Sequence, residues 1–274
     1  MRADVVLEGG GAKGVALAGA VAGLVDRGVQ VQRVAGTSAG AIVAALVAAG
    51  LPTDRLVALA RDLDLASLVP ERRLTRLGPL GRGLGVLLGR GQRDHRPLKA
   101  WLGEQLRDLG VERFGDLRVD DHGADGSPYH DRLPVPPGRL VVAVSDVSRG
   151  RRVLLPWDLP AYGFDPDRFR VVDAVAASAA IPLVFEPVRL RLPAGAPVAA
   201  GGPAPEAVLV DGGLTSNYPV DVFDRTDGRR PRWPTVGVKL SARPDAPSPA
   251  APVRGPIGYL RAVITTAVVM TARR

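Results

Sequence analysis

The first 65 residues of the chain alternate two kinds of apolar run, and this alternation constrains the fold more than any other feature. Residues 5–7 and 31–35 are short valine-containing runs, and each is followed by a longer run rich in alanine, valine and leucine, at 15–26 and 39–49. All four runs end within two residues of a glycine. A strand–helix–strand–helix order is typical of a parallel sheet covered by its crossover helices. We therefore expect an α/β fold with a mainly parallel central sheet and helices on both faces.

The rest of the chain is predicted to complete this one domain, residues 1–274, a length that suffices to bury a large core. Residues 71–138 are expected to form a connection and variable loops, within which the glycine-rich stretch 77–93 is a candidate lid. Residues 244–256 are expected to be a proline-rich linker to a C-terminal helix. Further helices are expected at 53–63, 97–109, 171–180 and 257–273, and further strands at 140–144, 152–155, 188–192, 207–210 and 235–240.

The segment Gly36-Thr37-Ser38-Ala39-Gly40 fits the G-x-S-x-G pattern of a nucleophile elbow. Such an elbow is a sharp strand-to-helix turn that exposes a serine hydroxyl, and its flanking glycines are needed because side chains there would collide. The segment stands between a predicted strand and a predicted helix, which is the required context. The N-terminus of that helix favours a negative charge that develops near the serine. Ser38 is therefore a candidate nucleophile.

A glycine-rich loop, Gly9-Gly10-Gly11-Ala12-Lys13-Gly14, follows the first predicted strand and fits G-x-G-x-x-G. A dinucleotide site uses such glycines to let a pyrophosphate approach the helix end. An acyl-transfer enzyme uses the same backbone N–H groups as an oxyanion hole, and a plain packing loop is a third reading of the pattern. A dinucleotide site typically has an acidic residue at the end of the second strand, where this chain has Gly36-Thr37-Ser38. The oxyanion hypothesis is favoured, and a dinucleotide-binding protein stays the alternative.

A nucleophilic serine needs a base, because its hydroxyl is too weakly acidic at neutral pH. The chain has three histidines, and we expect each of them at the solvated surface rather than as a base: His95, His122 and His130. A carboxylate is then the expected base. Asp211 is the best candidate, because it ends the apolar run 207–210 and precedes Gly212-Gly213, so that it can face a neighbouring backbone closely. Partial burial would raise its pKa toward a value that suits proton acceptance.

Together these motifs resemble those of the patatin-like phospholipases. The resemblance rests on the glycine-rich loop, the serine elbow and Asp211-Gly212-Gly213, which stand in the order of that family between about residue 4 and residue 240. Two further segments are similar to that family, namely Ser178-Ala179-Ala180-Ile181-Pro182 and the run from Asp211 to Pro219. Three glycine-bearing motifs at consistent spacing are specific, whereas any one of them alone is not.

The resemblance implies a three-layer α/β/α fold and hydrolysis of acyl esters in lipids, of the phospholipase A or lysophospholipase type, by a Ser–Asp dyad without histidine. It implies that Ser38 is the nucleophile, that Asp211 is the base and that Gly10 and Gly11 donate to the oxyanion. Lys13 takes the place of the basic residue usual in the first motif, where it would brace the loop. We expect no metal and no organic cofactor. An acyltransferase or thioesterase would share this chemistry, and a catalytically silent lipid-binding module of the same fold is a further alternative.

Charge and composition bear on partners and location. The formal net charge is +8, and residues 71–107 hold nine basic and three acidic side chains. A localised basic face suits peripheral contact with an anionic membrane surface, with a solvated arginine-rich surface as the alternative; no nucleic-acid partner is expected. The absence of cysteine excludes disulfides and thiolate metal sites. With no signal peptide or transmembrane segment in the sequence, we expect a cytoplasmic protein.

Overall fold

A computed structural model of the chain describes residues 1–10, 14–62, 94–119, 138–194, 196, 206–225, 231, 233–240, 253 and 255–272. The strands and helices, in chain order, are β1 (Arg2–Leu7), α1 (Gly14–Asp26), β2 (Gln30–Thr37), α2 (Ala39–Ala48), α3 (Thr53–Asp62), α5 (Arg96–Asp108), η3 (Phe114–Leu117), β3 (Leu140–Asp146), β4 (Arg151–Leu155), η4 (Leu159–Tyr162), α6 (Val171–Ser178), β5 (Val188–Arg191), β6 (Glu206–Asp211), α7 (Gly213–Ser216), η5 (Val220–Phe223), β7 (Thr235–Val238) and α8 (Gly255–Ala272).

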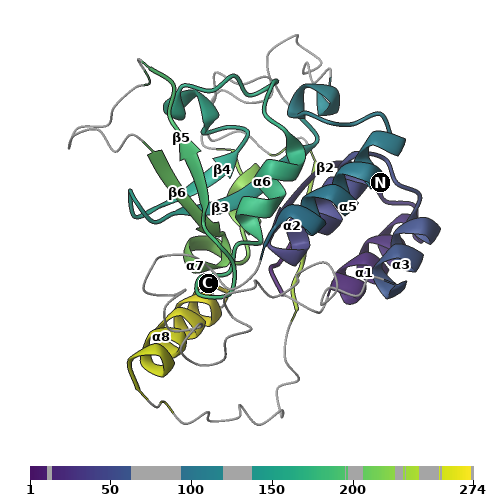
Figure 1. Cartoon of the computed structure of the whole chain (residues 1–274). Coiled ribbons are helices and arrows are strands. Elements are labelled where there is room, and N and C mark those ends of the chain that lie inside the picture. The colour runs from purple at the N-terminus through teal and green to yellow at the C-terminus, as the bar shows by residue number, and fades with distance from the viewer. Residues whose placement is uncertain are drawn as a thin grey trace.

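In the described part of the chain, seven strands form one mixed sheet in the order β5-β6-β3-β2-β1-β7, with β4 also paired with β3. Strands β7, β1, β2 and β3 run parallel to one another, and α1 makes the crossover from β1 to β2 (Figure 1). Strands β4 and β6 pair with β3 antiparallel, and β5 pairs with β6 in the same way. The predicted α/β fold with helices around a central sheet is confirmed. Its parallel half is the part that the first strand–helix repeats predict.

The strands of the parallel half are apolar on both faces, because both faces are covered. Along β1, Val5 and Leu7 belong to the larger core, whereas Val6 between them belongs to a smaller core on the opposite face. Helices α1, α2, α3, α5 and α6 fill the larger core (Figure 1). Trp157 and the residues of η5 fill the smaller one. Burial on both faces explains why these strands lack the apolar–polar alternation of a sheet with one wet face.

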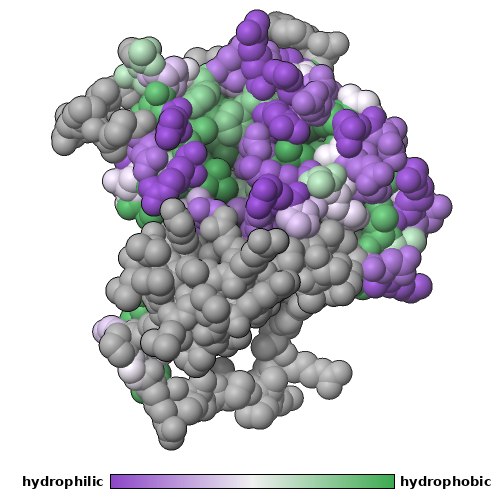
Figure 2. Space-filling view, viewed as in Figure 1, coloured by the Kyte–Doolittle hydropathy of each residue, from purple (hydrophilic) through white to green (hydrophobic). Residues whose placement is uncertain are grey.

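Helix α5 shows how the residue pattern sets the docking of a helix. Leu98, Leu102 and Leu106 recur every four residues, and all three are buried in the larger core. Pro97 stands in its first turn, where a missing N–H costs nothing. Its outward side is polar, and Figure 2 shows hydrophilic residues predominating on the side of the molecule where α3 and α5 lie. The leucine stripe thus sets which face of α5 packs on the core, and Pro97 favours the start of the helix.

Most predicted elements form close to their expected bounds. The predicted strands 140–144 and 152–155 form β3 and β4, which pair as an antiparallel hairpin, and α8 is the predicted C-terminal helix. β1 and β2 extend beyond the predicted 5–7 and 31–35, because their ladder already begins with Arg2 opposite Gln30. Backbone pairing continues past the apolar residues from which strands are recognised in a sequence.

Several predictions on loops fall outside the described residues. These are the candidate lid 77–93 and most of the predicted linker 244–256. The organisation of residues 1–274 as a single domain stays a prediction. None of the helices that the structure describes is both long enough and apolar enough to cross a membrane.

Candidate active site

Ser38 stands in the turn between β2 and α2, as the elbow pattern predicts. Its backbone has φ 54° and ψ −120°. A non-glycine residue at positive φ costs about 1–3 kcal/mol, and it keeps that conformation only where its surroundings hold it. The flanking glycines permit so sharp a turn. A Cβ on Gly36 would lie 2.3 Å from the Gly40 carbonyl oxygen, and a Cβ on Gly40 would lie 2.6 Å from the carbonyl oxygens of Leu7 and Glu8. A side chain at Gly36 would push β2 and α2 apart, and one at Gly40 would push α2 away from β1.

Strands β2 and β6 bring Ser38 and Asp211 together, because the two strands meet end to end along one edge of β3. β2 pairs with β3 as far as Thr37, which lies opposite Ala143. β6 runs in the opposite direction and ends with Asp211 opposite Val144, the next residue of β3. β4 occupies the other edge of β3 over the same stretch, so β2 and β6 share the remaining edge. The turn after one strand and the last residue of the other therefore meet.

The Ser38 side chain lies within reach of the Asp211 carboxylate, and as a donor there it lowers the pKa of the Asp211 carboxyl. Asp211 Oδ1 also accepts the backbone N–H of Gly213 at 2.7 Å. Asp211 is only 5% exposed. Burial raises the pKa of the Asp211 carboxyl to about 6, and donation by Ser38 and Gly213 acts in the opposite direction without cancelling it.

A carboxyl group in this state can take a proton from an alcohol. With a pKa of about 6, roughly nine-tenths of it is ionised at pH 7, and it is far more basic than an ordinary aspartate. The Ser38 hydroxyl is thus held against a charged and poorly solvated base. The N-terminus of α2 begins at the same turn, and its N–H groups and dipole favour negative charge there. The geometry suits a serine that attacks and an oxyanion that forms.

The chain after Asp211 folds back against the loop that follows β1. A Cβ on Gly212 would lie 2.2 Å from the Ala143 carbonyl oxygen, so only glycine lets the chain leave β6 at this point. Asn217 then clamps Gly9 from both sides: the Asn217 carbonyl accepts the Gly9 N–H at 2.9 Å, and Asn217 Nδ2 donates to the Gly9 carbonyl at 3.1 Å. Asn217 was not predicted as part of the site, although it lies within the run from Asp211 to Pro219.

The predicted glycine-rich loop is described in part. Gly9 and Gly10 are described and Gly14 begins α1, whereas Gly11-Ala12-Lys13 lies outside the described residues. The Gly9 N–H is engaged by Asn217, and a Cβ on Gly9 would lie 2.3 Å from the Asn217 Oδ1. Gly9 therefore serves close backbone packing. Donation to an oxyanion by Gly10 and Gly11 stays a prediction.

Two fully buried serines for which the sequence predicted no role also contact the Ser38–Asp211 pair. The Ser178 hydroxyl accepts the backbone N–H of Ser38 at 2.8 Å. The Ser145 hydroxyl donates to the Asp211 carbonyl oxygen at 2.8 Å. Ser145 and Asp146 end an otherwise apolar strand, and a buried strand that ends in polar residues is the one signal that could have marked Ser145. Ser178 lies in the family-like segment 178–182.

The histidines do not complete a serine–histidine pair in the described part of the chain. His95, expected at the solvated surface, is instead buried: its ring stacks on Phe185, and Nε2–H donates to the Glu186 carbonyl at 2.6 Å. Burial lowers the pKa of His95, and no hydrogen bond joins it to Ser38 or Asp211. His122 and His130 lie outside the described residues. Within the described ranges, no three histidine, aspartate or glutamate side chains cluster closely enough to hold a metal ion.

A mixed α/β sheet with a serine elbow at the end of one strand and a buried carboxylate at the end of the abutting strand defines the class of this protein. The family model for patatin-like phospholipases matches residues 5–224, a range that contains the glycine-rich loop, the elbow and Asp211. The chain belongs to the patatin-like phospholipase family, and the predicted resemblance is confirmed. Membership supports a lipid hydrolase at the level of the family.

Similar proteins carry little further information about activity. The uncharacterized protein YqhO of Bacillus subtilis (strain 168) is 34% identical over 243 residues, which cover 89% of this chain and 72% of that protein. The uncharacterized NTE family protein Rv2565 of Mycobacterium tuberculosis is 34% identical over 99 residues, 34% of this chain and 17% of that protein.

Among solved structures, VipD from Legionella pneumophila is 17% identical with a TM-score of 0.45, over 88% of this chain and 50% of that one. ExoU in complex with SpcU from Pseudomonas aeruginosa is 24% identical with a TM-score of 0.43, over 67% of this chain and 39% of that one. The chain thus spans half or less of each of these two solved chains, and likeness at this level carries no argument about function.

Proposed function

We propose that the chain is a serine acyl hydrolase that cleaves acyl esters of lipids, of the phospholipase A or lysophospholipase type, with Ser38 as nucleophile and Asp211 as base. The observation that carries the proposal is that the Ser38 elbow and the buried Asp211 carboxylate meet where β2 and β6 end against β3. The positive φ of Ser38 supports it, because strain of this kind concentrates at functional turns. Membership of the patatin-like phospholipase family supports the substrate class.

In the first half of the proposed reaction, Asp211 takes the hydroxyl proton as Ser38 Oγ bonds to the ester carbonyl carbon. The carbonyl π electrons move to oxygen, and a tetrahedral oxyanion forms. The oxyanion collapses, the bond to the alcohol oxygen breaks, and the leaving alcohol receives the proton from Asp211. The product is an acyl-Ser38 ester and a free alcohol. Asp211 is again ionised.

In the second half, Asp211 takes a proton from a water molecule, and the oxygen of that water bonds to the acyl carbonyl carbon. The second tetrahedral intermediate collapses to a carboxylic acid, and Ser38 Oγ recovers the proton from Asp211. An alcohol or thiol acceptor in place of water would give an acyltransferase by the same steps. A thioesterase would differ only in the leaving group of the first half.

The oxyanion donors in this proposal are the N–H groups of Gly10 and Gly11. Strand register supports the placement, because Leu7 pairs with Gly36 and the loop leaves β1 beside the elbow. The contact of Gly40 with the Leu7 and Glu8 carbonyls supports it as well. Removal of one such donor typically costs about 10²–10³ in kcat. Lys13 is proposed to brace this loop.

Peripheral contact with an anionic membrane is a further part of the proposal. Helix α8 packs against α7, the helix that follows Asp211 (Figure 1). Tyr259, Leu260 and Val263 lie within about one turn of α8 and are 65%, 44% and 46% exposed. Residues 246–274 carry four arginines and no acidic residue. A segment that combines exposed apolar side chains with a net positive charge in its sequence suits the surface of an anionic bilayer.

The test compares the wild type with Ser38→Ala and Asp211→Asn on a short-chain p-nitrophenyl ester. Both variants are expected to lose hydrolysis and keep the fold by circular dichroism, and a fluorophosphonate probe is expected to label Ser38. Retention of most activity by Asp211→Asn would exclude Asp211 as the base. Labelling at another serine would assign the nucleophile to that residue and exclude Ser38. Vesicle binding without turnover in the wild type would instead support a silent lipid-binding module.

A lipid panel scored by mass spectrometry, with Ser38→Ala as the blank, identifies the head group and the ester position. The same spectra separate hydrolysis from transfer, because an acyltransferase yields a new ester rather than a free fatty acid. A nucleotide-induced rise in melting temperature without serine labelling would favour the dinucleotide alternative.

A further inference from the structure

The turn that carries Ser38 needs a support from outside itself. Its φ of 54° is unfavourable for any residue with a side chain, and β2 stops pairing with β3 at Thr37. The backbone N–H of Ser38 therefore has no partner in the strand ladder. A buried N–H without a partner is costly, so this one must be satisfied by another group.

The hydroxyl of Ser178, the last residue of α6, supplies that partner. Ser178 Oγ accepts the Ser38 N–H at 2.8 Å and donates its own proton to the Ala143 carbonyl at 2.7 Å. The directions are fixed, because a backbone N–H only donates and a carbonyl oxygen only accepts. Ser178 is fully buried. One hydroxyl thus ties the start of the elbow to the last residue of β3 that pairs with β2.

Residues 178–180 also hold the backbone of Asp211 and Gly212. The Ser178 carbonyl accepts the Gly212 N–H at 3.4 Å, and the Ala180 carbonyl accepts the Asp211 N–H at 2.9 Å. The backbone on both sides of the Ser38–Asp211 pair is therefore held by residues 178–180. A shift of this segment would change the distance between the two reacting side chains.

We infer that Ser178 is a positioning residue for the proposed reaction: its buried hydroxyl holds the strained Ser38 backbone against β3 and so aims the Ser38 hydroxyl at Asp211. The inference rests on the proposed function. Ser178 touches no reacting atom, and its effect passes through Ser38. Loss of the hydroxyl leaves both the Ser38 N–H and the Ala143 carbonyl without this partner. The elbow is then free to relax toward negative φ, which turns the Ser38 side chain away from Asp211.

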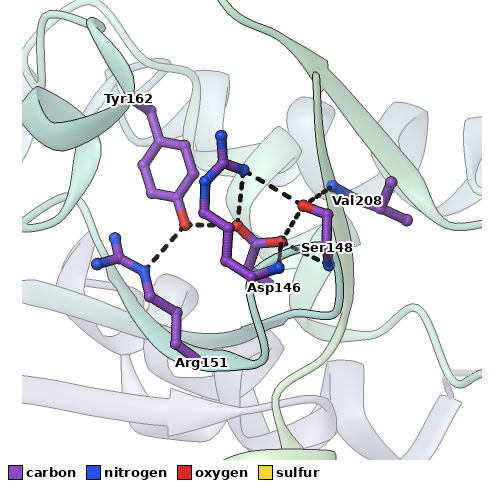
Figure 3. Close-up of polar contacts among 6 residues, drawn as sticks. Asp146, Ser148, Arg151, Tyr162 and Val208 are labelled. Atoms are coloured by element: carbon purple, nitrogen blue, oxygen red, sulfur yellow. Dashed lines mark hydrogen bonds and ion pairs between the residues drawn. The ribbon is translucent and has the colours of Figure 1, made fainter. Parts of the chain in front are cut away.

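A second serine provides a control, because its hydroxyl also donates one hydrogen bond and accepts a backbone N–H. Ser148 Oγ donates to the Asp146 carboxylate and accepts the Val208 N–H at 3.3 Å. Figure 3 shows this contact in the turn beyond β3, within a cluster that also contains Tyr162. Ser148 is exposed, whereas Ser178 is buried, and the Ser148 side chain contacts neither Ser38 nor Asp211. Ser148→Ala therefore removes a hydrogen-bonded serine hydroxyl without touching the elbow.

The test measures kcat and KM for a soluble short-chain p-nitrophenyl ester, the rate of fluorophosphonate labelling, and the melting temperature. Ser178→Ala is expected to lower kcat and the labelling rate together by about 10- to 100-fold, because small misplacements of reacting groups have effects of this size. KM is expected to change less than about twofold. Ser178→Cys, which keeps a weak donor and acceptor, is expected to fall between the wild type and Ser178→Ala, and it replaces that variant if the alanine does not fold.

Two controls separate positioning from stability. Ser148→Ala is expected to keep the wild-type kcat and labelling rate. Val175→Ala, a core truncation one turn earlier on α6, is expected to lower the melting temperature without lowering kcat. Wild-type kcat and labelling in Ser178→Ala would overturn the inference, as would a loss carried by KM or an equal loss of kcat in Val175→Ala. Failure of the proposed function is distinguishable, because the wild type itself would then lack labelling at Ser38.

Discussion

The pH dependence of ester hydrolysis follows directly from the burial of Asp211. Its pKa is raised from 3.8 to about 6 by burial, and only the ionised carboxylate can take the Ser38 proton. At pH 5 about one tenth of a group with pKa 6 is ionised, against about nine-tenths at pH 7. We therefore expect kcat/KM to fall about tenfold between pH 7 and pH 5. A base with the ordinary aspartate pKa of 3.8 would lose less than about a tenth over the same interval.

The assay is kcat/KM for a short-chain ester that has no ionisable group, measured from pH 4.5 to pH 8, with circular dichroism at each pH to confirm that the fold persists. The rate of fluorophosphonate labelling supplies a second readout, because it depends on the same proton transfer. Both profiles are expected to bend near pH 6. Profiles that stay flat down to pH 5 would refute the assignment of a buried Asp211 as base. A bend in hydrolysis alone would point to a later step.

Four substitutions test the energetics of the fold by urea unfolding. Asp211→Asn is expected to raise the free energy of unfolding at pH 7 by up to about 3 kcal/mol, because a folded-state pKa raised by about two units makes ionisation destabilising. The gain should shrink as the pH falls from about 6 to about 4 and vanish below about pH 3, where both states are protonated, and a gain that persists there would contradict this. Gly36→Ala is expected to destabilise the fold by about 1–3 kcal/mol or more, because the added Cβ would lie 2.3 Å from backbone. Gly19 is exposed in α1 with open space around a Cβ, so Gly19→Ala should stabilise the fold by about 0.5–1 kcal/mol. Similar effects of the two substitutions would refute the steric argument. Asp4→Ala is expected to cost about 3–5 kcal/mol, because Arg33 is buried beside Asp4 and would lose its counter-charge, and a loss below about 1 kcal/mol would show that water reaches Arg33.

The parts of the site that the sequence predicted are those set by local chemistry. The Ser38 elbow is recognisable because its two glycines are required by contacts of 2.3 and 2.6 Å, and no other residue type can stand there. Asp211 alone resembles an ordinary turn aspartate and is recognisable only beside the serine elbow, which needs a base, and Gly212 has its own close contact with β3. The hydrophobic pattern predicts the strand and helix on either side of Ser38 and the strand that ends before Asp211.

The parts that the sequence did not predict depend on contacts between distant segments. His95 has charged neighbours in the chain, Asp94 and Arg96, and these suggest a wet surface. Its actual partners are Phe185 and Glu186, which a local pattern cannot bring to it. The strands of the antiparallel half of the sheet are predicted but their order is not, for the same reason, because that order is fixed by pairings between distant segments such as β3 with β6.

The end-to-end meeting of β2 and β6 also explains how the proposed reaction can proceed without an imidazole. Opposite β3 the two strands end one residue apart, at Ala143 and Val144, so the backbone itself brings Ser38 beside Asp211 and no third residue is needed to connect them. A histidine would contribute a base with a pKa near 6.5. Burial between the sheet and the segment 178–180 brings the pKa of Asp211 to about 6. The fold thus gives a carboxylate the basicity of an imidazole, and the fall in rate between pH 7 and pH 5 measures that change directly.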